Sequence, residues 1–139
     1  MTTDKLEKEI AAGGYKFPRS ENLPVLLSPV KISGTNVTLE NSLAVHPMEG
    51  GDFALEDNSP TETIVRRYRR FARGGAGLIW FEATAVQEDA RSFDRQAMIT
   101  PENVDAYKRL VEQIKTENPN VKVIVQLTHS GRYSKRGRK

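Results

Sequence analysis

The stretch GGAGLIWFEAT, residues 74–84, decides the fold because it joins the end of a helix to a buried strand. Glycines such as Gly74 and Gly75 commonly end helices, since glycine readily adopts the left-handed backbone conformation required there. The apolar residues 78–81 then form an uninterrupted run of strand length, and polar character returns at residues 82–84. We therefore predict a helix that ends at residue 73 and a strand that runs into a polar end.

The residues before this stretch predict that helix and two smaller elements. Ser59 can cap the helix, Pro60 suits its first position, and Glu62 completes a capping box. Alternating apolar residues over 30–39 predict a small hairpin, and residues 43–45 predict a short strand. The helix carries apolar residues at helical spacing: Ile64, Val65, Tyr68, Phe71 and Ala72.

A second helix and a third strand follow a polar loop that runs to residue 99. Thr100 caps this helix, Pro101 takes its first position, and Asn118 followed by Pro119 ends it. Residues 121–125 are apolar apart from Lys122 and predict the third strand. The apolar face of the second helix consists of Val104, Tyr107, Leu110, Val111 and Ile114.

The order of these elements predicts an α/β fold with a parallel sheet. Short apolar strands that alternate with amphipathic helices imply right-handed crossovers and strands covered on both faces. The strands run into polar segments at residues 46–49, 82–84 and 126–132. Ligands bind at this end of parallel strands, so we expect a site there. The alternative is that these residues only mark where the strands reach water.

Composition narrows the possible classes of protein. The chain has 139 residues and no cysteine, which fits one domain and excludes disulfides and thiol chemistry. It has no apolar run long enough for a membrane helix, and residues 1–10 lack an apolar signal region, so we expect a cytoplasmic protein. His46 and His129 are too isolated to predict a metal site. Gly75 and Gly77 precede a strand, whereas a phosphate-binding glycine loop follows one.

Basic residues gather in two places. The segment Arg66-Arg67-Tyr68-Arg69-Arg70 is expected to be the solvated face of a helix. The C-terminal tail holds Arg132, Lys135, Arg136, Arg138 and Lys139. Such a tail can bind nucleic acid or an acidic partner, or it can simply be a solvated terminus.

Three motifs resemble the old yellow enzyme family, the FMN-dependent NADH:flavin oxidoreductases. Residues 41–48 resemble the family's first strand, which ends in a Pro-Met step. The other two are RRFARGGAGLIWFEATAV at 69–86 and QLTHSGR at 126–132. The resemblance covers residues 25–134 and identifies the N-terminal part of that family.

The resemblance implies a (β/α)8 TIM barrel that binds FMN at the C-terminal ends of its strands. We expect residues 1–24 to form an N-terminal arm and residues 25–139 to form a partial FMN-binding domain. This domain is an N-terminal hairpin plus the first three strands and two helices of an incomplete barrel, truncated after the third strand. Because such barrels need about 250 residues, we expect a fragment that is inactive alone, or completed by another chain or a second copy.

The family reaction passes hydride from NADH or NADPH through FMN to an activated alkene, a small-molecule substrate. By resemblance, Pro47, Met48 and Glu49 contact the flavin ring and Ala83 lies against it. Gln126 hydrogen-bonds the pyrimidine edge, for which an amide is suited because it both donates and accepts. No residue is predicted to be catalytic.

Residue 49 departs from the family, which usually has a small neutral side chain there. A carboxylate would disfavour negative charge on the reduced flavin, so Glu49 predicts a lowered flavin potential. Gln126 and Ile124 are expected to share the inward face of the third strand, with Val123 and Val125 toward the helices. His129 and Arg132 are expected to organise the loop.

The alternative is a non-enzymatic α/β binding module that uses its basic tail. A nucleic-acid partner is the less favoured form of it, because the tail has little aromatic content. No membrane partner is expected.

Overall fold

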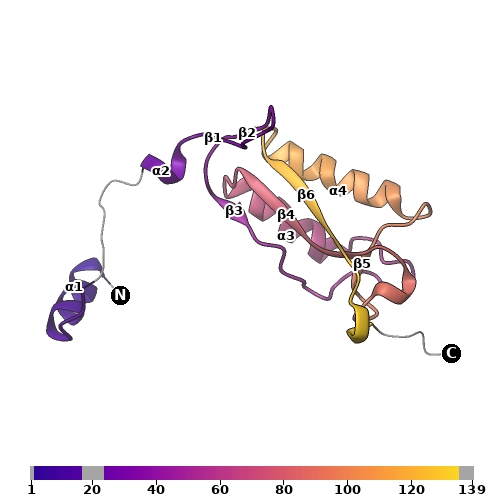
Figure 1. Ribbon diagram of the computed structural model, residues 1–139, viewed down its shortest axis with the longest axis horizontal. Coiled ribbons are helices and arrows are strands. Elements are labelled where there is room, and N and C mark those ends of the chain that lie inside the picture. The colour runs from indigo at the N-terminus through magenta and orange to yellow at the C-terminus, as the bar shows by residue number, and fades with distance from the viewer. Residues whose placement is uncertain (1, 17–23, 135–139) are drawn as a thin grey trace.

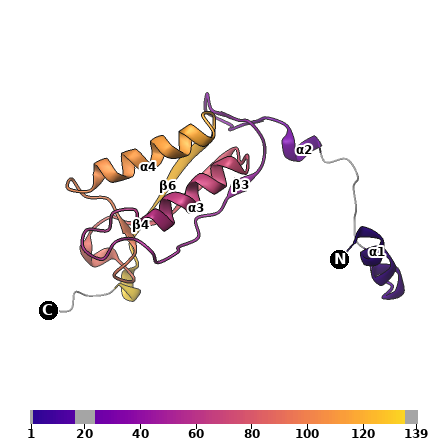
Figure 2. The same ribbon diagram turned by 180° about the vertical axis from the view of Figure 1, so that it is seen from behind.

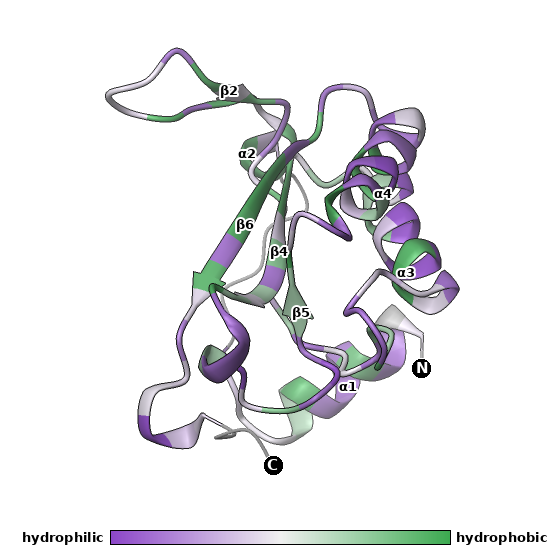
Figure 3. Ribbon diagram, turned by 90° about the vertical axis from the view of Figure 1, so that its right-hand side faces the viewer, coloured by the Kyte–Doolittle hydropathy of each residue, from purple (hydrophilic) through white to green (hydrophobic). Residues whose placement is uncertain are grey.

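A computed structural model of the chain describes residues 2–16 and 24–134. Two helices, α3 (Glu62–Arg73) and α4 (Val104–Glu117), lie on one side of a parallel sheet, as Figures 1 and 3 show. Helix α1 (Thr3–Ala12) lies apart from the sheet in Figures 1 and 2, and the short helix α2 (Pro24–Leu27) leads toward it. The basic residues after 134 lie outside the described residues, as does part of the predicted arm.

Strand β4 is the centre of the sheet. Strand β6 pairs with it in parallel along one side, and β3 and β5 pair in parallel with its beginning and its end on the other side. The bounds are β3 Ala44–Val45, β4 Leu78–Ala85, β5 Ala97–Met98 and β6 Lys122–Thr128. A separate antiparallel hairpin precedes them, with β1 Val30–Lys31 and β2 Thr38–Leu39. The predicted hairpin and parallel α/β order are confirmed.

Strand β5 corrects the prediction of a structureless loop up to residue 99. A 3-10 turn, Glu88–Ala90, and β5 both form within that stretch. The strand pairs over only two residues, with Thr84 and Ala85. So short a pairing leaves no periodic pattern in the sequence.

Strand β4 also extends further than its apolar run predicted. Residues 82–85 continue the strand, and its register against β6 shifts between Phe81 and Thr84. Ile79 and Phe81 point to the helices and are buried, while Trp80 is 42% exposed on the other face. An irregularity of this kind turns the side chains that follow it, and Glu82 is accordingly buried against α3.

Helix α3 begins two residues later than its sequence suggested. Its cap is Thr61, whose hydroxyl oxygen accepts from the Ile64 N–H at 3.4 Å and donates to the Asp52 carbonyl at 2.7 Å. The predicted cap, Ser59, instead donates to the Asp57 carboxylate. The helix ends at Gly74, as predicted.

Helix α4 likewise begins after Asn103 and not at Pro101. The side-chain oxygen of Asn103 accepts from the Thr100 N–H at 2.8 Å, and this bond holds residues 100–103 in a turn. Its amide donates to the backbone carbonyls of Asp57 and Met98. The predicted end of the helix at Asn118 is confirmed.

The glycines after α3 pack against the motif that precedes β3. Gly75 adopts φ +82° at the end of the helix. A side chain on Gly77 would meet the Asn41 backbone oxygen at 2.7 Å. The Asn41 amide donates to the Gly75 carbonyl and accepts from the Gly77 N–H. These glycines therefore serve close packing, and no phosphate loop follows the strand here.

The core lies between the sheet and the two helices. Phe81 stacks on Tyr68 with ring centroids 4.5 Å apart, and Phe53 stacks on Tyr107 at 5.9 Å. Val123 packs against this core, as predicted. On the opposite face of the sheet Trp80 is 42% exposed and its pairing partner Ile124 is 45% exposed, so only one face is covered among the described residues, contrary to the expectation of two.

Candidate functional site

The predicted ligand-binding residues lie at one end of the sheet. Strands β3, β4 and β6 are parallel neighbours, so their C-terminal ends meet at the same edge. Residues 47–49 follow β3, Ala83 lies near the end of β4, and Gln126 lies near the end of β6. We call this edge the strand-end face. The prediction that these segments share one face is confirmed.

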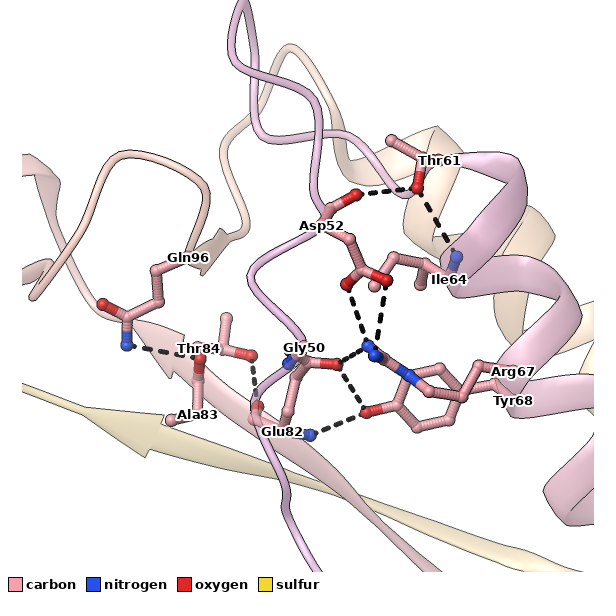
Figure 4. A network of polar contacts seen from close by, with 10 residues as sticks. All are labelled: Gly50, Asp52, Thr61, Ile64, Arg67, Tyr68, Glu82, Ala83, Thr84 and Gln96. Carbon is pink, nitrogen blue, oxygen red and sulfur yellow. Dashed lines mark hydrogen bonds and ion pairs between the residues drawn. The ribbon is translucent and has the colours of Figure 1, made fainter.

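Glu82 occupies the inner side of the strand-end face, and Figure 4 shows its contacts. Its residue is 1% exposed. One carboxylate oxygen accepts from the Gly50 N–H at 3.0 Å, and the other accepts from the Tyr68 hydroxyl at 3.0 Å and from Arg67. The Glu82 N–H donates to the Tyr68 hydroxyl oxygen, also at 3.0 Å. The carboxylate is thus fully engaged by protein donors, which compensates the cost of its burial.

Arg67 connects Glu82 to the loop after β3. Its guanidinium contacts both oxygens of Asp52, at 3.1 and 3.3 Å. Asp52 in turn accepts through its carbonyl from Thr61, the cap of α3 (Figure 4). This two-pronged geometry is a strong form of ion pair. It fixes the loop over the end of β4.

Tyr68 holds its proton firmly. Burial, and secondarily the charge of Glu82, raise the pKa of the Tyr68 hydroxyl well above its usual range. The hydroxyl therefore remains a neutral donor at any ordinary pH. The partners of Glu82 are committed to structure, and the Tyr68 hydroxyl keeps its proton.

Glu49 faces the same edge from the loop after β3. Its carboxylate oxygen accepts from the Gln96 amide at 3.2 Å. Burial, and then the charge of Glu82, raise the pKa of the Glu49 carboxyl. Glu49 is therefore easier to protonate than an ordinary glutamate.

Gln96 is the functional candidate that sequence reasoning missed. It is 2% exposed, and its amide nitrogen contacts the Ala83 carbonyl and the Thr128 hydroxyl in addition to Glu49. No periodicity or motif marked it, because its partners come from three segments distant in sequence.

Gln126 differs from the other amides near this face. The residue is half-buried, and its side-chain amide makes no hydrogen bond to any of the residues that the structure describes. By contrast, the side-chain amides of Asn58, Gln96 and Asn103 all have protein partners. Gln126 is thus available to a ligand.

The remaining predicted residues differ in exposure. Ala83 is 8% exposed, so only a small part of its surface could meet a ligand, while Met48 is 75% exposed. His129 accepts from the Gly131 N–H, and Arg132 donates to Tyr133. The last two residues bond within their own loop, as predicted.

Within residues 2–16 and 24–134 no cluster of metal-ligating side chains forms. In the same ranges no helix has the length and apolar character to cross a membrane.

The fold and the strand-end face are those of part of a (β/α)8 barrel. The chain belongs to the NADH:flavin oxidoreductase / NADH oxidase family, whose model matches residues 25–139. FMN and a nicotinamide are the cofactors of that family, as the resemblance implied.

Individual relatives agree with this assignment. An NADPH dehydrogenase of Listeria monocytogenes is 37% identical over 99 residues, covering 70% of this chain and 28% of the relative. One of Bacillus subtilis is 32% identical over 108 residues, covering 77% and 31%. The chain thus spans roughly three tenths of the length of these relatives.

Solved structures show the same partial overlap. The old yellow enzyme from Trypanosoma cruzi matches with a TM-score of 0.67 and 25% identity over 80% of this chain and 28% of its own. Morphinone reductase matches with a TM-score of 0.66 and 26% identity over 84% and 29%. The predicted barrel-type fold is confirmed.

Proposed function

We propose that this chain supplies part of the FMN site of an old yellow enzyme-type oxidoreductase. In the reaction of that type of enzyme, NADH or NADPH reduces the flavin, and the reduced flavin then reduces an activated alkene. Membership of the family supports the cofactor. The common strand-end face of Pro47, Met48, Glu49, Ala83 and Gln126 supports the site.

The observation that carries the proposal is the unpartnered amide of Gln126. Neither of its polar atoms is among the buried unpaired ones of the described residues, so the amide is accessible to water or to a ligand. The pyrimidine edge of a flavin presents both donors and acceptors, and an amide complements both. Gln126 would therefore orient the ring, with residues 47–49 along its edge and the small Ala83 side chain beneath it.

The chain's own residues bind and orient the cofactor in this proposal, and none of them moves a proton. Bound FMN supplies the hydride chemistry. Glu82, Arg67 and Tyr68 keep the loop after β3 in place, so they act on the site through its shape.

The described part of the site is open on one side. Met48 and Leu127 are both largely exposed at its rim. A flavin held here would have protein on one side only, so we expect weak FMN binding and no turnover by this chain alone. A complementing chain or a second copy is one way in which such a site could be closed.

A titration of the purified chain with FMN tests the proposal. We expect saturable quenching of flavin fluorescence. A chain that fails to quench flavin, yet binds RNA with an affinity that falls steeply with salt, would instead support a binding module that uses its basic tail.

A further inference from the structure

Gln96 lies where three strand ends meet, and the proposed FMN site does not use it. Its amide nitrogen is 3.2 Å from a Glu49 carboxylate oxygen. The same nitrogen is 3.3 Å from the Ala83 carbonyl and 3.3 Å from the Thr128 hydroxyl oxygen. These partners come from the loop after β3, from β4 and from β6.

Ser92 fixes the orientation of the Gln96 amide. The Ser92 backbone N–H donates to the amide oxygen at 2.8 Å, and the Ser92 hydroxyl lies 3.2 Å from it. A backbone N–H can only donate, so the oxygen of the amide must face Ser92. The NH2 group therefore faces the three oxygens on the other side.

The Gln96 amide nitrogen has fewer hydrogens to donate than there are acceptor oxygens around it. An amide nitrogen carries two hydrogens, and three oxygens lie within reach of it. The Ala83 carbonyl can only accept. An ionised Glu49 attracts the other hydrogen more strongly than the neutral Thr128 hydroxyl does, because charged acceptors form stronger bonds. When Glu49 is protonated, that hydrogen becomes available to Thr128.

We propose that Gln96 is a positioning residue that couples the Glu49 carboxyl group to Thr128, and through Thr128 to the end of β6 that carries Gln126. Thr128 pairs with Ala85 of β4, and its carbonyl accepts from the Val86 N–H at 3.1 Å. A change at its hydroxyl is therefore transmitted to a paired strand end. That the coupling adjusts a flavin-binding amide rests on the proposed function.

The charged surroundings of Glu49 set when the coupling changes. On β4, Glu82 adds negative charge, which together with burial raises the pKa of Glu49. Arg67 from α3 is bound both to Glu82 and to Asp52 of the loop. From β5 and β6 the facing side chains are the neutral Gln96 and Thr128. The transition therefore falls above the pH at which an ordinary glutamate titrates.

A pH titration by nuclear magnetic resonance of the full 139-residue chain, without FMN, tests the coupling. The signals to follow are the Glu49 carboxyl carbon, the Thr128 methyl group and the Gln126 side-chain amide. In the wild type we expect all three to shift with one midpoint. In Gln96→Leu, we expect the Glu49 carbon signal still to shift with pH. The Thr128 and Gln126 signals should lose the step, which is their shift at that midpoint.

Two further variants complete the test. Thr128→Val keeps the side-chain shape without the hydroxyl and should abolish the Gln126 step even if Gln96→Leu does not fold. Gln113→Leu, on α4, should leave all three steps unchanged. A Gln126 step that survives in Gln96→Leu or Thr128→Val, or that is missing in the wild type, would overturn the inference.

A separate FMN titration distinguishes this inference from the proposed function. Coupling without FMN binding would overturn the proposed function alone. FMN binding without coupling would overturn the role of Gln96 alone.

Discussion

Among single residues, Glu82 shows how this chain keeps a charge inside a small fold. Its carboxylate replaces water with the Gly50 N–H, the Tyr68 hydroxyl and the Arg67 guanidinium. Removing one partner of a buried charge is costly, because the charge remains without its full set of donors.

Tyr68→Phe tests this account. We expect a loss of about 1–3 kcal/mol in the free energy of unfolding, since the hydroxyl both donates to Glu82 and accepts from its N–H. Urea denaturation measures the change. Tyr107→Phe is the matched control, because Tyr107 is also buried but its hydroxyl donates to a neutral acceptor, the Asn58 carbonyl. The account fails if the Tyr68 variant loses no more stability than the Tyr107 variant.

Glu49 gives a second prediction at this scale. Ionised Glu49 next to a flavin disfavours the anionic reduced form, so Glu49→Thr should raise the flavin potential. We expect a rise in potential on the order of 30 mV, which corresponds to about 1.4 kcal/mol for a two-electron couple. Because the pKa of Glu49 is raised, the difference should shrink as the pH falls through that pKa. Potentiometry of FMN-loaded protein that shows equal potentials at all pH values would refute it.

How far these residues could be predicted depends on whether the strand pattern fixes them. Strand order predicts that the segments carrying Glu49, Ala83 and Gln126 meet, because parallel neighbours bring their C-terminal ends together. The choice of these residues within the segments came from the resemblance to the old yellow enzyme family. Gln96 does not follow from strand order, since a loop folds back and delivers it. The partners of Glu82 were also missed, because the register shift in β4 turns that side chain toward α3.

Between elements, Glu117 of α4 joins the two helices by accepting from two arginines of α3. It accepts from Arg73 Nε at 3.0 Å and from Arg69 Nε at 2.8 Å. Hydrogen bonds from Arg73 and then Arg69 lower the pKa of Glu117 to about 2.

This lowered pKa predicts an acid dependence of stability. The unfolded chain protonates Glu117 near the ordinary glutamate pKa of 4.5, and the folded chain does so only near a pKa of about 2. The stabilisation is therefore present above pH 4.5 and is lost as the pH falls toward 2. In Glu117→Gln, the unfolding midpoint should depend less on pH across this window than it does in the wild type. Glu112→Gln, an exposed α4 carboxylate without an ion pair among the described residues, should not; equal curves for Glu117→Gln and wild type would contradict the prediction.

Helix existence was predictable from apolar spacing, and helix starts were not. Ser59 and Thr100 each stand before a proline, the pattern expected of a cap. The chain uses Thr61 for α3 because its hydroxyl also reaches the Asp52 carbonyl. For α4, Asn103 holds the preceding turn closed. Both choices depend on loops that pack against the helix ends.

In the whole molecule, one face of the sheet is left uncovered among the described residues. Trp80 and Ile124 are exposed there, and the outer edge of β6 has no partner strand in the described part of the chain. Exposed apolar faces and free strand edges favour association.

We therefore expect the isolated chain to self-associate as its concentration rises. Ile124→Lys should shift the distribution toward monomer, because a charge at this position opposes burial of the face. Sedimentation velocity at several concentrations measures it. Leu55→Lys, in the loop before α3, is the control and should have no effect. A wild-type chain that stays monomeric throughout would contradict the prediction.

The central claim is that Gln126 orients a flavin at the strand-end face. Its most direct test is the FMN affinity of Gln126→Leu, measured by fluorescence quenching beside wild type and Gln113→Leu. We predict roughly tenfold weaker binding for Gln126→Leu, about 1.4 kcal/mol, as expected for one lost set of amide hydrogen bonds. The Gln113 variant should match wild type. Equal affinity of Gln126→Leu and wild type, or no saturable binding by either, would contradict the claim.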